Sequence, residues 1–171
     1  WQGQIADQLI LRPDGSSRTV QDSSFSIKNG SDRIIGTIMR DITEQKKAED
    51  KLKKWADAFN SAEWGIIVSE GVGTRMEMMN PAFAEMHGYT VEELTGRSAI
   101  ELFTPELQED LLKQIQIANE KGHHVFESMH IRKDGSKFPV RIYVTAVENY
   151  NGEPLYRIVN VMDITKEKEE L

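Results

Sequence analysis

The sequence contains no cysteine. This absence excludes disulfide bonds, thiolate metal sites and every catalytic mechanism that needs a thiol. The sequence also lacks any apolar run of the roughly 20 residues that a helix needs to cross a bilayer, so we expect no membrane span in this segment. No signal-peptide pattern opens the chain. Together these absences favour a cytoplasmic protein, and a membrane anchor elsewhere in a longer protein is compatible with them.

An excess of basic charge is absent as well. Over 171 residues the net charge is -7, with 39% hydrophobic and 29% charged residues. This composition is typical of a soluble globular protein. Because an acidic surface repels phosphate backbones, we expect no nucleic-acid partner.

The motifs of common enzymes are missing too. No G-x-S-x-G turn surrounds a serine, and Gly71-Val72-Gly73 lies in an expected hairpin and opens no helix, so it is not a phosphate-binding loop. None of the four histidines is followed by the acidic or proline residues of a kinase phospho-acceptor box. We therefore expect no catalytic residue and no enzymatic activity, with any output enzyme outside this chain.

What the sequence does contain is an internal repeat. Residues 12–16 (RPDGS) recur as residues 132–136 (RKDGS), and residues 41–43 (DIT) recur as residues 163–165. The spacing of the two landmarks differs by two residues between the copies, which places one small insertion in a loop. Asp-Gly and Asn-Gly pairs supply the positive φ angles of tight hairpins, so each copy is predicted to form three antiparallel strands.

The second copy has a regular strand pattern. Its apolar residues alternate with outward positions and so indicate one buried face; they are Phe138, Val140, Ile142, Val144 and Ala146. Residues 156–164 are apolar on both faces and are predicted to form a central strand.

The contexts of the two copies predict different domain status. Residues 1–43 are interpreted as the C-terminal half of a preceding domain, and residues 62–165 as a complete domain. Three strands alone leave an apolar face uncovered. We therefore expect the first copy to be poorly ordered or covered by another chain.

A helix is predicted to connect the copies over residues 44–61, because good helix formers follow Thr43 and no glycine or proline occurs before Gly65. It carries a heptad seam with two polar members and an overlapping apolar stripe. The seam is Ile42, Gln45, Glu49, Leu52, Ala56 and Phe59, and the stripe is Ala48, Leu52, Trp55 and Phe59. Two interpretations stay open: an amphipathic helix that packs on its own domain, or a parallel dimeric coiled coil. Residues 166–171 are predicted to start a second such helix.

The region 62–165 has the signals of an α+β fold. Strands are predicted at residues 65–69 and 75–79, and Asn80-Pro81 is a strong helix start. Thr90 to Glu93 forms a capping box, and Pro105 opens a longer helix. The order β-β-α-α-α-β-β-β predicts a five-stranded antiparallel sheet with helices on one face.

Four landmarks in this region resemble the PAS domain family. They are, in order, residues 80–83 (NPAF), 88–96 (GYTVEELTG), 133–136 (KDGS) and 163–165 (DIT). The ordered set, half of it repeated in residues 1–43, is specific. The resemblance implies a cytoplasmic sensor or interaction module, set in tandem upstream of an output domain such as a histidine kinase or cyclase.

The resemblance also implies a ligand cavity between the helices and the sheet. The candidates for its lining are Met79, Phe83, Met86, Leu111, Ile115, Met129, Ile142 and Val161. Methionine adapts to varied apolar partners, so a ligand would be small and mostly apolar. The alternative is that these side chains simply fill the core.

The resemblance limits the cofactors. Without cysteine, the flavin adduct and the thioester-bound chromophore of light-sensing PAS domains are excluded, whereas non-covalent flavin stays open. Haem is not expected, because haem-binding relatives commonly carry their ligand on the long helix, and Pro105 to Ala118 contain no histidine.

The histidines are not expected to form a site. His87 is predicted to lie at the surface or at a helix cap, and His130 to point out from the sheet. The adjacent His123 and His124 point to opposite faces of a strand, so no shared metal is expected.

The DIT motifs join the last strand of each copy to a helix. We hypothesise that Thr165 caps this helix and Asp163 holds an adjacent donor, and that Asp41 and Thr43 act in the same way upstream. A change in the cavity would then bias the helix; the alternative is a plain cap. The expected partners are a second copy, through the linker helix and sheet, and a small apolar ligand. A ligand-free dimerisation and relay module is the alternative function.

Overall fold

The computed structural model describes residues 4–170. They divide into two compact units, the first ending at Ala56 and the second beginning at Asp57. Within residues 4–170, none of the helices is both long and apolar enough to cross a membrane.

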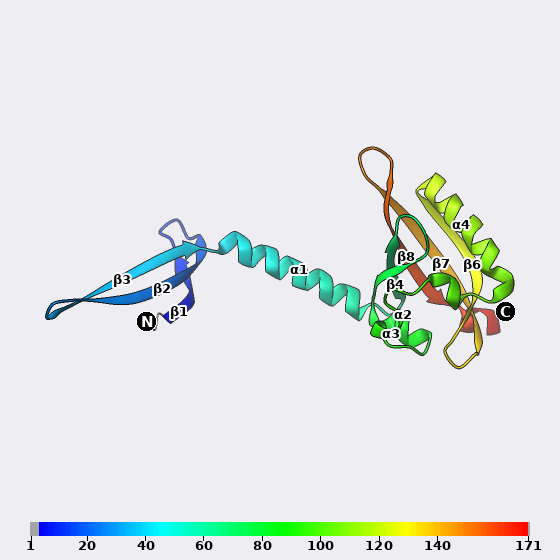
Figure 1. Ribbon diagram of the computed structural model, residues 1–171, viewed down its shortest axis with the longest axis horizontal. Coiled ribbons are helices and arrows are strands. Elements are labelled where there is room, and N and C mark those ends of the chain that lie inside the picture. Colours follow the sequence, from blue (N-terminus) through cyan, green and yellow to red (C-terminus); the bar gives the residue numbers. More distant parts are fainter. Residues whose placement is uncertain (1–3, 171) are drawn as a thin grey trace. The chain divides into compact units, whose positions relative to one another are not determined.

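The first unit is a three-stranded antiparallel sheet that leads into a helix (Figure 1). Its strands are β1 (Gln4–Leu11), β2 (Ser17–Asn29) and β3 (Asp32–Asp41), paired in this order, and α1 (Thr43–Ser61) follows. Six apolar side chains of this sheet are at least 64% exposed: Ile5, Leu9, Leu11, Ile35, Ile38 and Met39. The three strands and the uncovered apolar side chains agree with the sequence prediction.

The RPDGS and RKDGS turns are built in the same way. Asp14 Oδ1 accepts the Ser16 N–H at 2.8 Å, and Asp134 Oδ1 accepts the Ser136 N–H at 2.9 Å. Gly15 and Gly135 have φ values of 82° and 85°. An L side chain rarely adopts this conformation, so glycine is required there.

The second unit has two short strands, a helical segment and three long strands. In chain order its elements are β4 (Gly65–Glu70), β5 (Met76–Met79), α2 (Pro81–Met86), α3 (Val91–Leu94), 3₁₀ turns at Ala99–Leu102 and Pro105–Leu107, α4 (Gln108–Lys121), β6 (His123–Ile131), β7 (Lys137–Glu148), β8 (Pro154–Asp163) and α5 (Thr165–Glu169). Figure 1 shows α4 lying along the sheet beside β6 and β7.

The strand order is β5-β4-β8-β7-β6, with every pair antiparallel. This confirms the predicted five-stranded sheet with helices on one face, and β8 is the central strand as expected. On β7 the alternating residues Phe138, Val140, Ile142 and Val144 are at most 3% exposed. Burying such side chains stabilises the domain by about 1.5–3 kcal/mol each.

The start of α2 is fixed by one buried polar residue. Asn80 is fully buried, and its Oδ1 accepts the N–H groups of Phe83 at 3.1 Å and Ile66 at 2.8 Å. Its Nδ2 donates to the carbonyl oxygens of Phe59 at 3.1 Å and Trp64 at 2.9 Å. Asn80 therefore joins the end of α1, the start of β4 and α2, and so sets the position of Phe83.

Candidate functional site

A cavity of about 50 Å³ lies between the sheet and the helices of the second unit. Its lining is mostly apolar and consists of Ile67, Ser69, Thr74, Phe83, Ala99, Leu102, Phe103, Leu111, Ile115, Phe126, His130, Ile142, Val144, Arg157, Val159 and Val161. Typical sites for drug-sized ligands occupy 300–1,000 Å³, on the order of ten times more. The cavity in this form has room for a few heavy atoms, and a flavin or a porphyrin does not fit.

Five of the eight predicted lining residues lie on the wall: Phe83, Leu111, Ile115, Ile142 and Val161. The other three do not. Met79 is buried in the surrounding core, and Met86 borders an open groove with Trp64 on another side of α2.

Met129 was assigned to the wrong face of β6. The β6–β7 register pairs Phe126 with Ile142 and His130 with Phe138, so the even-numbered residues of β6 share the inner face. Met129 pairs with Pro139 and belongs to the opposite face. Neighbouring residues of a strand point to opposite sides, so the error for Met129 and the error for His130 have one cause.

His130 lies inside the domain, contrary to the prediction that it points outward. It is 2% exposed and lines the cavity. His87 was predicted at the surface or at a cap; it is the C-cap residue of α2, but its side chain is fully buried. The signal that could have found His130 is the KDGS turn, because this hairpin sets His130 opposite the inward Phe138.

The two buried imidazoles form one hydrogen-bonded chain. His87 Nδ1 lies 2.8 Å from the carbonyl oxygen of Phe83, and His87 Nε2 lies 2.8 Å from His130 Nδ1. A carbonyl oxygen only accepts, so His87 carries its proton on Nδ1 and its Nε2 accepts from His130 Nδ1–H. The remaining nitrogen, His130 Nε2, is then an acceptor, and it has no hydrogen-bond partner among residues 4–170.

Burial keeps both imidazoles neutral. Loss of hydration lowers the pKa of His87 to about 4. The pKa of His130 lies well below its usual value because of burial and because His87 is adjacent. Three phenylalanine rings surround the pair: Phe83 lies 4.5 Å from His87, Phe103 lies 4.4 Å from His130, and Phe138 lies 5.2 Å from His87, centroid to centroid.

Arg157 is the charged residue of the cavity wall. Its side chain is 2% exposed, and its Nη1 donates to the carbonyl oxygen of Gly71 at 2.7 Å and to Asn119 Oδ1 at 3.4 Å. Its Nη2 donates to the carbonyl oxygen of Gly73. Burial lowers its pKa. Arg157 therefore holds the β4–β5 turn against α4 through neutral acceptors.

The junction between β8 and α5 is built around Asp163. Its Oδ1 accepts both the backbone N–H of Thr165, at 2.9 Å, and the Thr165 hydroxyl, at 2.5 Å. Ile164 is the N-cap residue of α5 and Thr165 is the first helical residue, so the prediction that Thr165 itself caps α5 is wrong. The carboxylate of Asp163 holds the first turn instead. Burial raises the pKa of Asp163, but the hydrogen bonds from Thr165 and from Arg132 outweigh it, so the pKa lies below its usual value.

Arg132 connects this junction to α2. Its Nη2 donates to Asp163 Oδ2 at 3.0 Å, and its Nη1 donates to the carbonyl oxygen of Met86 at the end of α2. Its guanidinium lies 3.7 Å from the centroid of the Phe138 ring. The same helix end carries His87 and, one turn earlier, Phe83 of the cavity wall.

The upstream junction repeats this geometry. Asp41 Oδ1 accepts the N–H of Thr43 at 2.9 Å and its hydroxyl at 2.6 Å. One bond is added, because the N–H of Thr19 donates to Thr43 Oγ1 at 2.9 Å. The corresponding residue of the second copy is Pro139, which has no N–H to donate.

A second contact repeated in both copies ties each outgoing helix to its own sheet. Lys168 of α5 pairs with Glu127 of β6 at 2.7 Å, and Lys46 of α1 pairs with Asp7 of β1 at 3.0 Å. These positions correspond in the repeat. Each DIT motif is therefore followed by a lysine that contacts an acidic residue on the first of the three repeated strands, β1 or β6.

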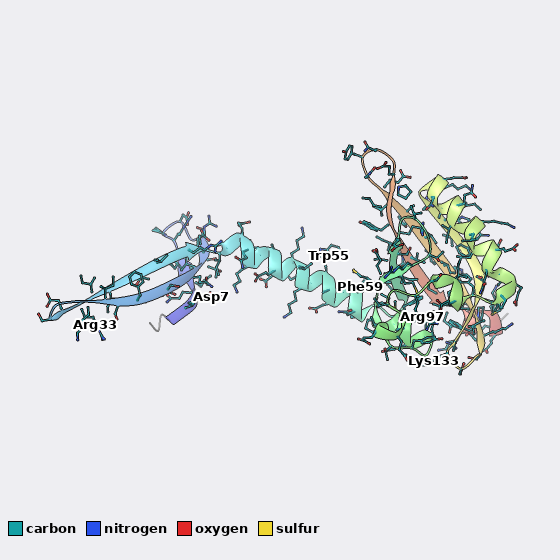
Figure 2. All side chains as sticks on the ribbon, viewed as in Figure 1. Asp7, Arg33, Trp55, Phe59, Arg97 and Lys133 are labelled. Carbon is teal, nitrogen blue, oxygen red and sulfur yellow. The ribbon has the colours of Figure 1, made fainter. Side chains whose placement is uncertain are left out.

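The corner between α2 and α3 is tied to the KDGS turn. Two cations lie near the ring of Tyr89, with Arg97 and Lys133 each 5.3 Å from its centroid. Lys133 also pairs with Glu93 at 2.5 Å, and its backbone N–H donates to the carbonyl oxygen of His87 at 2.9 Å. Figure 2 labels Arg97 and Lys133 in this region of the second unit.

The described residues hold no cluster of three or more His, Asp or Glu side chains placed to bind a metal ion. His123 and His124 occupy successive positions of β6, the first exposed and the second half-buried. His124 Nε2 lies 2.6 Å from Gln114 Oε1 of α4, which makes it part of the packing between helix and sheet.

A family model described as PAS domain matches residues 6–44 and 65–166. The chain belongs to the PAS domain family. The matched residues include most of β1, the other seven strands and the helices α2, α3 and α4, and they leave out most of α1 and of α5.

Two curated relatives and one solved structure illustrate the similarity. The chain is 29% identical over 113 residues to the probable diguanylate cyclase DgcE of Escherichia coli, covering 64% of this chain and 10% of that protein. It is 27% identical over 121 residues to a blue-light-activated histidine kinase of Rhizobium johnstonii, covering 68% of this chain and 35% of that protein. A PAS domain from Colwellia psychrerythraea superposes with a TM-score of 0.63 at 24% identity, covering 68% of this chain and 99% of that one. The PAS match supports a role in signalling, and the lack of cysteine excludes a cysteine-dependent flavin adduct.

Proposed function

We propose that this chain is the sensor and relay part of a larger signalling protein: the PAS domain of the second unit detects a small ligand in its cavity and passes the response to α5. The observation that carries the proposal is the position of Arg132. It donates to Met86 at the end of α2 and to Asp163 at the start of α5. Since Phe83 and His87 of the same helix contact the cavity or its wall, a shift of α2 reaches the helix cap through one side chain.

The output is proposed to be a histidine kinase or a cyclase outside this chain. The names of the two curated relatives, a histidine kinase and a diguanylate cyclase, support this assignment. The chain spans 35% and 10% of those proteins. The PAS region is therefore proposed to be regulatory, with catalysis elsewhere.

We also propose that the first sheet is the C-terminal half of a preceding PAS domain. The turn at Asp14, the cap at Asp41 and the ion pair of Lys46 all repeat contacts of the complete domain. The family match to residues 6–44 supports the same assignment. A signal from that domain would leave through Asp41 and Thr43 into α1.

A homodimer through α1 is proposed as the arrangement that transmits the signal. Leu52 and Trp55 of the predicted stripe are 71% and 67% exposed, and Figure 2 labels Trp55 with Phe59 on this helix. A parallel coiled coil would bury this stripe. Analytical ultracentrifugation of the chain and of the Leu52→Lys variant measures the oligomeric state. We expect the unchanged chain to be a dimer and the variant to be a monomer.

The relay is tested by Asp163→Ala in the full-length protein. Loss of the carboxylate removes the acceptor of the first helical turn and the partner of Arg132, so the ligand response of the output activity is expected to fall strongly while cavity binding is kept. The matched control is Glu120→Ala, an exposed acid on α4 remote from the junction. An Asp163→Ala protein with an unchanged response rejects the relay.

A ligand-free relay module is the second candidate, and the small volume of the cavity favours it. Native mass spectrometry of the purified chain separates the two. A bound small molecule supports sensing, whereas an empty dimer supports relay alone.

A further inference from the structure

We propose that the cavity of the second unit binds a small neutral molecule through a hydrogen bond donated by the ligand to His130 Nε2, a site class typified by short alcohols. This inference rests on the proposed function, because it names the chemistry of the ligand that the sensor would detect. It starts from one buried atom, His130 Nε2, for which the described residues supply no hydrogen-bond partner.

The direction of the imidazole chain makes that atom an acceptor. The carbonyl oxygen of Phe83 fixes the proton of His87 on Nδ1, and His87 Nε2 in turn fixes the proton of His130 on Nδ1. His130 Nε2 keeps its lone pair and has no partner in the described part of the chain. A second acceptor cannot satisfy it, so only a donor group completes this chain.

The position of His130 on the cavity wall leaves Nε2 on the side of the ring away from His87. His130 lines the cavity and His87 does not, so the Nδ1 side of the His130 ring faces away from it, toward His87. Two phenylalanine rings pack against this ring, with centroids 4.4 Å away for Phe103 and 6.0 Å away for Phe138. Nε2 lies across the ring from the nitrogen that is already used.

The fold itself does not require histidine at this position. In the first sheet the corresponding residue is Ile10, which occupies the same register opposite residue 18 that His130 occupies opposite Phe138. Leaving a buried acceptor unpaired destabilises a protein by an amount that an apolar side chain at that position would avoid. Pairing with His87 uses only the Nδ1 of His130, so the unpaired Nε2 is the atom that a bound donor group would satisfy.

The wall defines the rest of the ligand. Apart from His130, the surfaces near β6 and α4 are the apolar side chains of Phe126, Leu111 and Ile115. A carboxylate has no N–H or O–H to donate to His130 Nε2, and a cation would meet the positive charge of Arg157 on the same wall, so the ligand is neutral. The volume of about 50 Å³ limits it to a few heavy atoms, with one O–H or N–H group and an aliphatic remainder.

The experiment compares 2-propanol with acetone on the full 171-residue chain. The two probes have the same heavy-atom skeleton, but only 2-propanol donates a hydrogen bond. Titrations are followed through the side-chain ¹⁵N resonances of the histidines and the amide resonances of β6. We expect 2-propanol to bind roughly tenfold more tightly than acetone, the equivalent of one hydrogen bond, and to move the His130 Nε2 resonance upfield, as acceptance of a proton donor requires.

The variant pair is His130→Phe and His124→Phe. The first removes the acceptor at similar volume and is expected to abolish the preference for 2-propanol over acetone. The second is the matched control on the same strand, because His124 already contacts Gln114 and does not line the cavity. If His130→Phe does not fold, two measurements on the unchanged protein still test the proposal: the relative affinity of the two probes and the shift of the His130 Nε2 resonance.

Three outcomes overturn the proposal: equal binding of the two probes, no binding of either, or a Nε2 resonance that reports a bound water which 2-propanol does not displace. Failure of the proposed function has a different signature. In that case 2-propanol binds at His130 with the expected preference, but the output of the full-length protein stays constant as the site fills.

Discussion

The two sheets of this chain have the same local chemistry and different burial. Their Asp-Gly turns, Asp-Ile-Thr junctions and lysine contacts share the same bonds, and the first junction adds the bond from Thr19 to Thr43. Yet Phe138, Val140 and Ile142 of the second sheet are at most 2% exposed, whereas Ile35 and Ile38 of the first are 71% and 64% exposed. The hydrogen bonds that shape a PAS hairpin are thus encoded in a few neighbouring residues, while the core of the second unit depends on α2 and α4, which pack against its sheet.

The largest expected effect of this difference in burial is on stability, and it is tested by the substitutions Phe138→Ala and Ile35→Ala. Truncating Phe138 removes contacts with His87, His130 and Arg132, so the free energy of unfolding of the second unit is expected to fall by about 3–5 kcal/mol. Truncating the exposed Ile35 should change the first unit by less than about 0.5 kcal/mol. Amide hydrogen exchange of β8 and of β2, resolved by NMR, measures each unit separately. Similar losses in both would mean that the first sheet is covered in solution.

The two units are also expected to differ in how their stability depends on acidic pH. The unfolded pKa of histidine is 6.5 and that of folded His87 is about 4, so below pH 6.5 the unfolded state takes up protons that the folded state cannot. The second unit should therefore lose about 1.4 kcal/mol per pH unit for each buried histidine as the pH falls from 6.5 toward 4, with no contribution above 6.5.

The first unit should not show this loss, because all four histidines lie in the second. Its lowered pKa values belong to Asp7, Asp14 and Asp41, whose ordinary value is 3.8, so its acid sensitivity begins at lower pH. Urea unfolding followed through the NMR amide signals of β7 and β2 measures both. The double substitution His87→Phe and His130→Phe should remove the slope, and His123→Gln should keep it; a slope that survives the double substitution contradicts this origin.

The smallest expected effect is the difference in stability between alanine substitutions of the two junction threonines, Thr43 and Thr165. Thr43 Oγ1 accepts the N–H of Thr19 as well as donating to Asp41, so Thr43→Ala leaves a part-buried donor unpaired and should cost about 1–3 kcal/mol. Thr165→Ala loses one bond to Asp163 and should cost about 0.5–1.5 kcal/mol. Hydrogen exchange at the first turns of α1 and α5 reports the difference. Thr43→Ser keeps both bonds and should behave like the unchanged protein; the reverse order of the two alanine effects would refute the role given to Thr19.

Much of the fold could be predicted from the sequence because its signals are local. Asn80-Pro81 gave the start of α2, Thr90 and Glu93 gave the capping box, and the Asp-Gly turns gave the hairpins. Period-two alternation predicted the inner face of β7, and an apolar pattern on both faces predicted the central position of β8. Five of the eight cavity candidates, which the resemblance to PAS domains suggested, lie on the wall.

The polar part of the site could not be read in this way. The pairing of His87 with His130 joins the end of α2 to the far edge strand, and no local pattern predicts such a contact. The face of Met129 and His130 depended on hairpin register, where a slip of one residue exchanges inside and outside. Arg157 was missed because its partners are backbone carbonyl oxygens, which any sequence supplies.

The guanidinium of Arg157 has a consequence for which molecules the cavity admits. Its hydrogen bonds end on carbonyl oxygens and an amide, so its positive charge is not neutralised by these partners. A cation that entered the same small space would meet this charge at short range and in low dielectric, where repulsion between like charges is strong. The charge of Arg157 therefore disfavours ammonium and divalent metal ions in the cavity, whatever their size.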